Sequence, residues 1–132
     1  MIIKLSGIFM IKGIGTDIVE IARIKKALAS QSFVSRVYTE KEQQYCQSRG
    51  KQQAQSYAAR FSGKEAVMKA FCTGLRGGTL LDIEILPDEL GCPKVKLTGY
   101  FADLAKKKAI KNIWLSLSHS HEYATAECIM EG

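Results

Sequence analysis

Residues Arg60–Phe71 read RFSGKEAVMKAF and form the second half of a helix that is predicted to run from Gln53 to Cys72. Apolar residues recur on one side of its helical wheel at Ala54, Ala58, Phe61, Met68 and Cys72. Glu65 falls within this stripe, where a carboxylate costs free energy unless a cation, a metal ion or several donors meet it. Lys69 follows one turn later, so an intrahelical Glu65–Lys69 pair is one explanation and a functional site is the other.

The length and composition predict a single globular domain over residues 1–132. A chain of 132 residues is long enough for one hydrophobic core and too short to expect two. Apolar residues make up 46% and charged residues 24%, values typical of soluble proteins. The 19 Lys and Arg residues outnumber the 13 Asp and Glu residues, and the resulting net charge of +6 favours an anionic partner.

The cysteines and the N-terminal segment favour a cytoplasmic protein. The 4 cysteines are widely spaced and form no C-x-x-C pair, which argues against a structural zinc site and a disulfide framework. Residues 1–10, MIIKLSGIFM, are apolar but too short for a membrane span and lack a small-residue cleavage site. Neither a membrane partner nor a signal peptide is predicted. Met10 is a candidate natural start, with residues 1–9 as an extension.

The first half of the chain is predicted to be mainly helical. Residues 11–19 alternate as a β-strand does, and their glycines allow other groups to approach the backbone. A helix is expected over residues 18–29. Thr39 and Glu42 have the spacing of a capping box, which predicts a further helix that ends near Ser48. The long helix of residues 53–72 follows.

The second half is predicted to be mostly antiparallel sheet. Strands are expected over residues 81–86, 94–97, 113–118 and 123–130, and a helix over residues 98–108. These patterns together predict an α+β fold, with a helical first half and a long central helix packed on a small, mostly antiparallel sheet.

Three groups of polar residues are candidates for chemistry: Asp17 with Glu20 and Arg23, Lys64 and Glu65 with Lys69, and the segment Ser118-His119-Ser120-His121. Asp17 stands at a predicted strand-to-helix junction, where capping the helix is the ordinary role of an aspartate. His119 and His121 are candidate metal ligands, but no third ligand stands nearby, which favours turn or surface histidines. No group decides the function alone.

Together these segments resemble the motifs of the holo-acyl-carrier-protein synthases, which are small 4′-phosphopantetheinyl transferases. Residues 13–23, GIGTDIVEIAR, resemble the opening motif G-I-G-x-D-(five residues)-R. Residues 60–70, RFSGKEAVMKA, resemble the second motif, R-F-(two)-K-E-A-(two)-K-A, and Thr73-Gly74 stands where a G-T-G-like loop follows. Residues 114–124, WLSLSHSHEYA, resemble the closing strand. The order and spacing agree from about residue 10 to residue 131.

The sequence departs from the family pattern in three places. Gly63 stands where a small non-glycine residue is usual, and glycine costs about 1 kcal/mol inside a helix. Residues 90–93, LGCP, replace the usual N-G-K-P, which puts in doubt any contact made there by the missing Asn and Lys. Residues 1–9 have no counterpart.

The resemblance implies that the fold is that of a 4′-phosphopantetheinyl transferase. It also implies transfer of the 4′-phosphopantetheine arm of coenzyme A to a serine of apo-acyl carrier protein for fatty acid biosynthesis, with release of adenosine 3′,5′-bisphosphate. The implied cofactor is Mg²⁺, which is commonly bound by one or two carboxylates together with substrate phosphates and water. Asp17 and Glu65 match the metal ligands of the family. Lys69 would stabilise the transferred phosphoryl group.

The resemblance also implies two binding surfaces and an assembly. Residues expected to hold coenzyme A are Arg60, Lys64, Gly74, Ser118, His119 and Ser120. Residues expected to bind the acidic acyl carrier protein are Arg23, Lys25 and Lys26, because basic side chains steer an acidic partner. The family forms homotrimers with active sites between subunits, so the same assembly is expected here.

Two other functions also fit the composition. A basic nucleic-acid-binding domain would explain the charge, but no recognisable nucleic-acid motif is present, and Asp17 and Glu65 would have no task. A transferase acting on another carrier domain is the second alternative. The short chain favours the fatty-acid type, because broader relatives are about twice as long.

Overall fold

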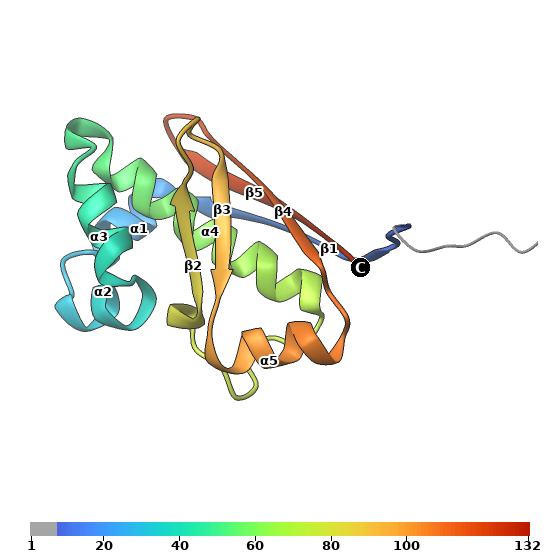
Figure 1. Cartoon of the computed structure of the whole chain (residues 1–132). Helices are drawn as coiled ribbons and strands as arrows, with labels where there is room; N and C mark the ends of the chain where they lie inside the picture. Colours follow the sequence, from blue (N-terminus) through green and yellow to red (C-terminus); the bar gives the residue numbers. More distant parts are fainter. Residues whose placement is uncertain (1–7) are drawn as a thin grey trace, which may run out of the picture.

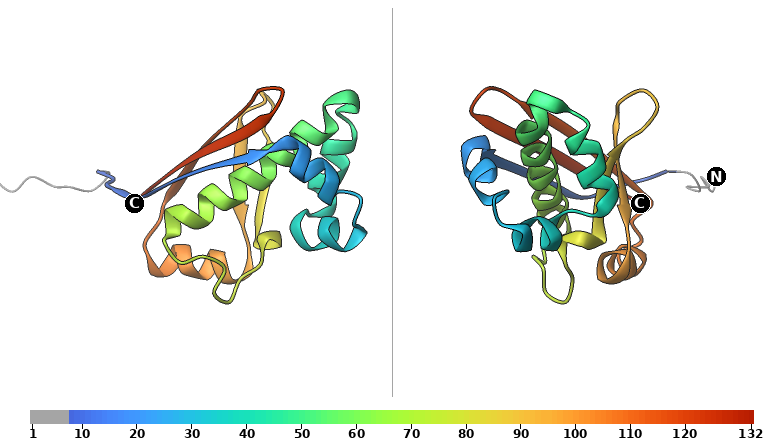
Figure 2. Two further views of the ribbon diagram at one scale, coloured as in Figure 1. Left: turned by 180° about the vertical axis from the view of Figure 1, so that it is seen from behind. Right: turned by 90° about the vertical axis from the view of Figure 1, so that its left-hand side faces the viewer.

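The computed structural model describes residues 8–132. Its elements are β1 (Ile11–Glu20), α1 (Ile21–Ala27), α2 (Gln31–Val37), α3 (Glu40–Gln47), η1 (Gly50–Gln52), α4 (Gln53–Phe71), η2 (Leu80–Asp82), β2 (Ile83–Pro87), β3 (Pro93–Leu97), α5 (Gly99–Lys107), β4 (Asn112–His119) and β5 (Tyr123–Glu131). Helix α4 runs through the middle, between the sheet of β1, β5 and β4 and the hairpin of β2 and β3 (Figures 1 and 2). Helices α1–α3 gather at one end of α4, and α5 lies near the other (Figure 1).

Both sheets are antiparallel. The three-stranded sheet has the order β1-β5-β4, and β2 pairs only with β3. This architecture confirms the predicted α+β class, the long central helix and the mostly antiparallel second half. Among residues 8–132, none of the helices combines the length and the apolar character that crossing a membrane requires. The proposed N-terminal extension lies, for residues 1–7, outside the described part of the chain.

In the first half, the predicted junction between the first strand and the first helix is wrong, and one short helix was not predicted. Strand β1 continues to Glu20, which pairs with Tyr123 of β5, so α1 begins at Ile21 and not at residue 18. Helix α2 was not predicted, because its seven residues are too few to show a helical period. Its N-terminus is capped by Ser30, whose hydroxyl accepts a hydrogen bond from the backbone of Phe33 at 3.2 Å.

Helix α4 is buried on most of its sides, which corrects the predicted one-sided stripe. Ala59, Lys64 and Val67 are all buried although they lie on different sides of the helix. Glu65 is only half-buried, and Lys69, one turn later, is exposed. The sheet covers one side of α4, and the hairpin and the other helices cover further sides. The side of α4 that remains accessible to solvent is therefore the one that carries Glu65 and Lys69.

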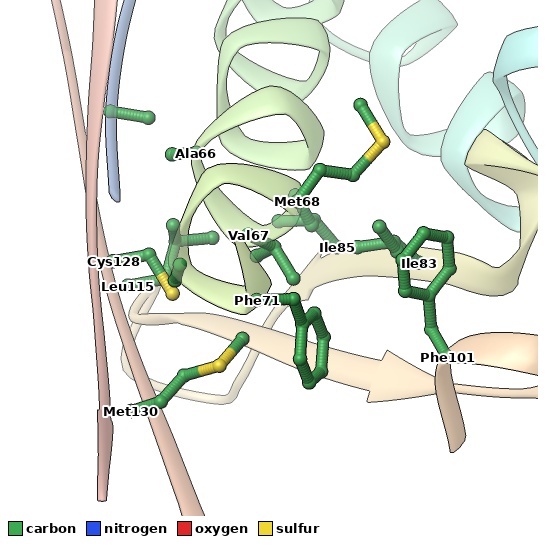
Figure 3. Packing of buried hydrophobic residues seen from close by; sticks show 12 residues of the cluster. Ala66, Val67, Met68, Phe71, Ile83, Ile85, Phe101, Leu115, Cys128 and Met130 are labelled. Atoms are coloured by element: carbon green, nitrogen blue, oxygen red, sulfur yellow. The ribbon is translucent and has the colours of Figure 1, made fainter. Parts of the chain in front are cut away.

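Two hydrophobic clusters hold these layers together. The first joins the second half of α4 to the sheet, the hairpin and α5, and it includes a stacked pair of Phe71 and Phe101 with ring centroids 5.7 Å apart (Figure 3). The second joins the first half of α4 to α1–α3, where the Tyr38 and Tyr57 rings meet edge to face at 4.7 Å.

Strand β1 passes so close to α4 that only glycine fits at the contact. A Cβ atom placed on Gly13 would overlap the carbonyl oxygen of Ala70, and one on Gly15 would overlap that of Ala66. The obstacle at each position is helix backbone, which cannot turn aside as a side chain can. The two glycines therefore set the distance between β1 and α4.

We expect Gly15→Ala to lower the free energy of unfolding by at least about 2–3 kcal/mol, because the strand must move away from the helix. Chemical denaturation followed by circular dichroism measures this loss. Gly77→Ala is the matched control, since its added Cβ would meet only the Tyr100 ring at 3.4 Å, an ordinary contact. Equal stability of the Gly15 and Gly77 variants would contradict the close-contact argument.

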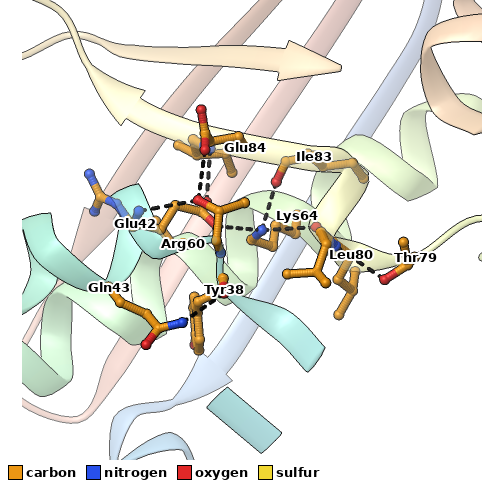
Figure 4. A network of polar contacts seen from close by, with 12 residues as sticks. Tyr38, Glu42, Gln43, Arg60, Lys64, Thr79, Leu80, Ile83 and Glu84 are labelled. Atoms are coloured by element: carbon orange, nitrogen blue, oxygen red, sulfur yellow. Dashed lines mark hydrogen bonds and ion pairs between the residues drawn. The ribbon is translucent and has the colours of Figure 1, made fainter. Parts of the chain in front are cut away.

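A buried ion pair fixes the other side of α4. The ammonium group of Lys64 lies 2.7 Å from Glu42 Oε1, and both side chains are fully buried. Lys64 also donates to the carbonyl oxygens of Leu80 at 2.9 Å and Ile83 at 2.7 Å (Figure 4). Glu42 Oε2 accepts from the backbone of Ile85 at 2.8 Å. The pair thus ties α3, α4 and the start of β2 to one another.

The predicted capping box forms part of the same network. Thr39 Oγ1 accepts from the backbone N–H of Glu42 at 3.2 Å, and the backbone N–H of Thr39 donates to Glu42 Oε1 at 2.9 Å. Thr39 Oγ1 also donates to Glu84 Oε2 at 2.7 Å. The carboxylate of Glu42 therefore has a cation and two backbone donors, which offsets the cost of burying its charge.

We expect Lys64→Met to cost about 3–5 kcal/mol of stability, because Glu42 would keep a buried negative charge without a cation. The matched control is Lys94→Met, which removes an exposed pair with Asp88 at 4.0 Å and should cost less than about 1 kcal/mol. Denaturant titrations of both variants measure the difference. A loss for Lys64→Met as small as that of the control would contradict the anchoring role.

Candidate functional site

Asp17, Glu65 and Lys69 come together where β1 crosses α4. The ammonium group of Lys69 donates to Asp17 Oδ1 at 3.2 Å and to the carbonyl oxygen of Thr16 at 3.1 Å. No Glu65–Lys69 ion pair occurs within residues 8–132, so the structure does not contain the intrahelical pair that was one of the two explanations for Glu65. Lys69 instead crosses to the neighbouring strand.

Asp17 does not cap a helix. It lies inside β1, opposite Ala126 of β5, and the cap position of α1 belongs to Glu20, whose side chain makes no capping bond. The Asp17 side chain is 14% exposed and the Lys69 side chain 56%, so the pair opens to solvent on the lysine side. The predicted alternative role of Asp17, capping a helix, is therefore excluded.

The electrostatics of Glu65 indicate a shared carboxylate site. Burial raises the pKa of Glu65, the negative charge of Asp17 raises it further, and Lys69 opposes both effects. A carboxylate whose ionised form is disfavoured in this way is stabilised by a proton or by a divalent cation. Perturbed groups of this kind gather at functional sites.

The two carboxylates suit Mg²⁺ better than they suit a metal ion whose ligands all come from the protein. No group of three or more His, Cys, Asp or Glu side chains in residues 8–132 is placed to hold a metal ion. At the β1–α4 crossing, the described residues offer two carboxylates, Asp17 and Glu65, both with hard oxygen ligands. Mg²⁺ is usually held by one or two carboxylates and completes its shell with water and substrate phosphates. The residues present fit that pattern.

A cavity of about 180 Å³ lies beside the first half of α4. Its polar lining comes from Arg49, Gln52, Ser56, Arg60 and His119, and its floor includes Pro87 and Pro93 of the β2–β3 hairpin. Arg60 and His119 were both predicted to hold the coenzyme, and the structure brings them to one cavity. The sequence predicted no binding role for Tyr45 or Arg49, which also line the cavity. Arg49 follows the end of α3 closely, and a basic residue at such a place is a signal from which an anion contact could have been predicted.

Lys64 does not reach this cavity or the surface. Its ammonium group makes one ion pair and two hydrogen bonds in the interior, and burial lowers its pKa despite the opposing effect of Glu42. Its predicted contact with coenzyme A is therefore wrong. The motif places Lys64 next to Glu65, but a step of one residue turns it about 100° around the helix.

The segment at the end of β4 divides between two faces of the sheet. His119 and Leu117 line the cavity, so Ser118, between them on the strand, faces the opposite side. Within one chain, the Ser118 side chain does not line this cavity, and its contact with the coenzyme stays a prediction. The hydroxyl of Ser120 accepts from the backbone N–H groups of Glu122 at 3.3 Å and Tyr123 at 3.2 Å, which shapes the turn before β5.

The remaining predicted residues lie on open surface. Gly74 follows the end of α4 with a φ of 64°, in the left-handed region, and nothing lies within 4 Å of where its Cβ would be. Arg23, Lys25 and Lys26 are exposed on α1. Arg23 borders a small hollow with Ile18 and Tyr123. Within residues 8–132, the side chains of Arg23, Lys25 and Lys26 form no ion pair with a carboxylate.

Known proteins are similar to this chain in sequence and in fold. Residues 13–128 match the model of the 4′-phosphopantetheinyl transferase superfamily. A holo-(acyl-carrier-protein) synthase of Clostridium botulinum (strain Alaska E43 / Type E3) is 49% identical over 123 residues, which cover 92% of this chain and 98% of that protein.

Two solved structures support the same assignment. A holo-(acyl-carrier-protein) synthase from Neisseria meningitidis superposes with a TM-score of 0.85 at 33% identity, over 93% of this chain and 100% of that one. One from Bacillus anthracis, in complex with CoA (3′,5′-ADP), gives a TM-score of 0.78 at 35% identity, over 93% and 98%. The predicted family resemblance is confirmed, and the chain belongs to the 4′-phosphopantetheinyl transferase superfamily.

Proposed function

We propose that this protein is a holo-acyl-carrier-protein synthase. It transfers the 4′-phosphopantetheine group of coenzyme A to a serine of apo-acyl carrier protein, giving the holo form and adenosine 3′,5′-bisphosphate, for fatty acid biosynthesis. The observation that carries this proposal is the cluster of Asp17, Glu65 and Lys69 at the β1–α4 crossing of a superfamily member. Relatives that bear this name, and one that was solved with CoA, support it.

Asp17 and Glu65 would hold Mg²⁺, which when bound neutralises negative charge on the diphosphate that is broken. Lys69 supplies positive charge at the same place. Its long, exposed side chain donates a hydrogen bond to Asp17 Oδ1 at 3.2 Å, a contact that a phosphoryl oxygen can replace. Charge stabilisation by fixed groups is the main protein contribution to phosphoryl transfer.

The cavity lined by Arg60 and His119 would hold the nucleotide part of coenzyme A. Arg60 is 5% exposed and lies on α4 five residues before Glu65, so a ligand that spans both would run along the helix. The backbone around His119 and Ser120 and the loop at Gly74 would contribute further contacts. The attacking serine belongs to the carrier, so this chain needs no activated nucleophile of its own.

The outward face of the three-stranded sheet supports a homotrimer. Ile14, Ile129 and Trp114 are paired side by side across β1, β5 and β4, and they are 69%, 42% and 52% exposed. A continuous apolar row of this kind marks an interface. Ser118 lies on the same face, so a second copy would bring it towards a site. A sedimentation mass equal to a single chain would contradict the trimer.

Arg23, Lys25 and Lys26 would bind the carrier protein. They stand on one short helix, exposed, and none forms an ion pair with another described residue. Positive groups without internal partners are available to steer an acidic protein.

A coenzyme A-dependent reaction and 4 unpaired cysteines are consistent with a cytoplasmic enzyme.

We expect mass spectrometry of apo-acyl carrier protein, incubated with this protein, coenzyme A and Mg²⁺, to show the gain of one phosphopantetheine. Glu65→Gln should lower the rate at least about 100-fold, because it removes charge from the metal pair. A wild-type protein that leaves the carrier unmodified, where a known transferase modifies it, would refute the proposed function.

The same variant separates a catalytic Glu65 from a structural one. Because its folded pKa is raised, ionised Glu65 destabilises the metal-free fold at pH values above that pKa, and the penalty disappears below the pKa of the unfolded chain. Glu65→Gln should therefore be at least as stable as wild type at neutral pH. A poorly folded but active variant would instead indicate a structural Glu65.

We expect Arg23→Glu with Lys26→Glu to raise the KM for the carrier protein about tenfold or more, and to leave the KM for coenzyme A unchanged, because like charges repel an acidic partner. Steady-state kinetics with each substrate varied in turn measures both constants. Lys51→Glu with Lys107→Glu, at two exposed lysines of η1 and α5, is the charge-matched control, because it reverses the same number of positive charges. An unchanged KM for the carrier would place its binding surface elsewhere.

A further inference from the structure

Tyr45 contacts both arginines of the coenzyme cavity. It lies on α3, half-buried, and lines the cavity together with Arg49 and Arg60. The Cζ atom of Arg60 lies 4.3 Å from the centroid of the Tyr45 ring, and that of Arg49 lies 5.7 Å from it. Both distances are within about 6 Å, the range in which the face of an aromatic ring attracts a cation.

The charge of Arg60 is not neutralised by a carboxylate in the described chain. Its Nη1 donates to the carbonyl oxygen and to Oγ of Ser56, both at 3.3 Å, which is long for a charged donor. Its Nε is buried and has no hydrogen-bond partner. No carboxylate in residues 8–132 pairs with Arg60 or Arg49, since Glu42 is taken by Lys64.

A buried guanidinium with an unpaired donor at a cavity wall is completed by an anion. Two positive groups close together repel each other, so the arrangement needs something to hold it before the anion arrives. The Tyr45 ring is the group that contacts both. Holding them in place in advance reduces the side-chain entropy that a ligand must overcome on binding.

We propose that Tyr45 is a positioning residue for coenzyme A: its ring holds the Arg60 guanidinium, with that of Arg49 beside it, at the wall that receives a phosphate monoester. This inference rests on the proposed function. The diphosphate of the coenzyme is assigned to Asp17 and Glu65 with their metal ion. The anionic group of the nucleotide that remains for this cavity is the phosphate on the ribose. A guanidinium suits it because its N–H groups form a planar fork.

Steady-state kinetics with coenzyme A and with dephospho-coenzyme A, which lacks the ribose phosphate, tests the proposal. Tyr45→Leu should raise the KM for coenzyme A about 2- to 30-fold and leave kcat unchanged. The KM for dephospho-coenzyme A should stay that of the wild type. Tyr45→Phe keeps the ring face and should restore the KM for coenzyme A to within about twofold of wild type.

Gln44→Leu, at the exposed neighbouring position, is the matched control and should change neither constant. Tyr45→Gln replaces Tyr45→Leu if the latter does not fold. In an Arg60→Gln background, removal of the Tyr45 ring should have no further effect, because the two residues act as a unit. An equal rise in KM for both coenzymes, or an undiminished effect in that background, overturns the proposal.

The two proposals fail in different ways. A wild-type protein without transferase activity refutes the proposed function and does not itself concern Tyr45. Calorimetric binding of adenosine 3′,5′-bisphosphate then decides the inference with the same variants. Weaker binding by Tyr45→Leu, with recovery in Tyr45→Phe, supports the positioning role, and equal binding by all variants overturns it.

Discussion

The backbone of β1 lies directly against the backbone of α4, and the candidate site depends on this contact. Gly13 and Gly15 leave room for the carbonyl oxygens of Ala70 and Ala66, where any side chain would keep strand and helix apart. Lys69 can therefore reach Asp17 across the gap at 3.2 Å. Residues about 50 positions apart in sequence become one electrostatic unit because two side chains are absent.

The elements with strong local signals could be predicted from sequence. The long helix, the capping box at Thr39 and the closing pair of strands all have patterns that neighbouring residues determine. The junction after β1 could not be predicted, because Glu20 stays in the strand only through its pairing with β5. Helix α2 is held by the second core cluster and not by its own periodicity.

The motifs predicted which residues come together where chemistry constrains residue type, and they failed where burial decides the place of a side chain. Asp17, Glu65 and Lys69 meet as the motifs implied, although Lys69 pairs with the strand and not with Glu65. Lys64 looks equally suitable in the sequence, yet it is fully buried. Nothing in a single sequence distinguishes a lysine that meets Glu42 in the interior from one that meets a ligand.

The glycine-rich strand also explains why a carboxylate is tolerated on α4. A helix covered on several sides by sheet, hairpin and helices offers few positions where a charge stays hydrated. Glu65 and Lys69 lie on the solvent-accessible side of α4. Strand β1 borders this side, and it contributes Asp17 while its glycines contribute no side chain. The same close approach that excludes a Cβ thus leaves the space in which charged groups can gather.

The rotation of α4 is what separates the structural charges from the functional ones. Lys64 and Glu65 are consecutive, so they point about 100° apart, one into the interior and one towards β1. Turning the helix by one residue would bury Glu65 with no cation beside it. It would also expose Lys64 and leave its partner, Glu42, buried and unpaired. The Lys64–Glu42 pair therefore makes the alternative rotation costly and keeps Glu65 facing Asp17. A buried ion pair adds little net stability in general, but here it selects one orientation of the helix, and the site requires that orientation.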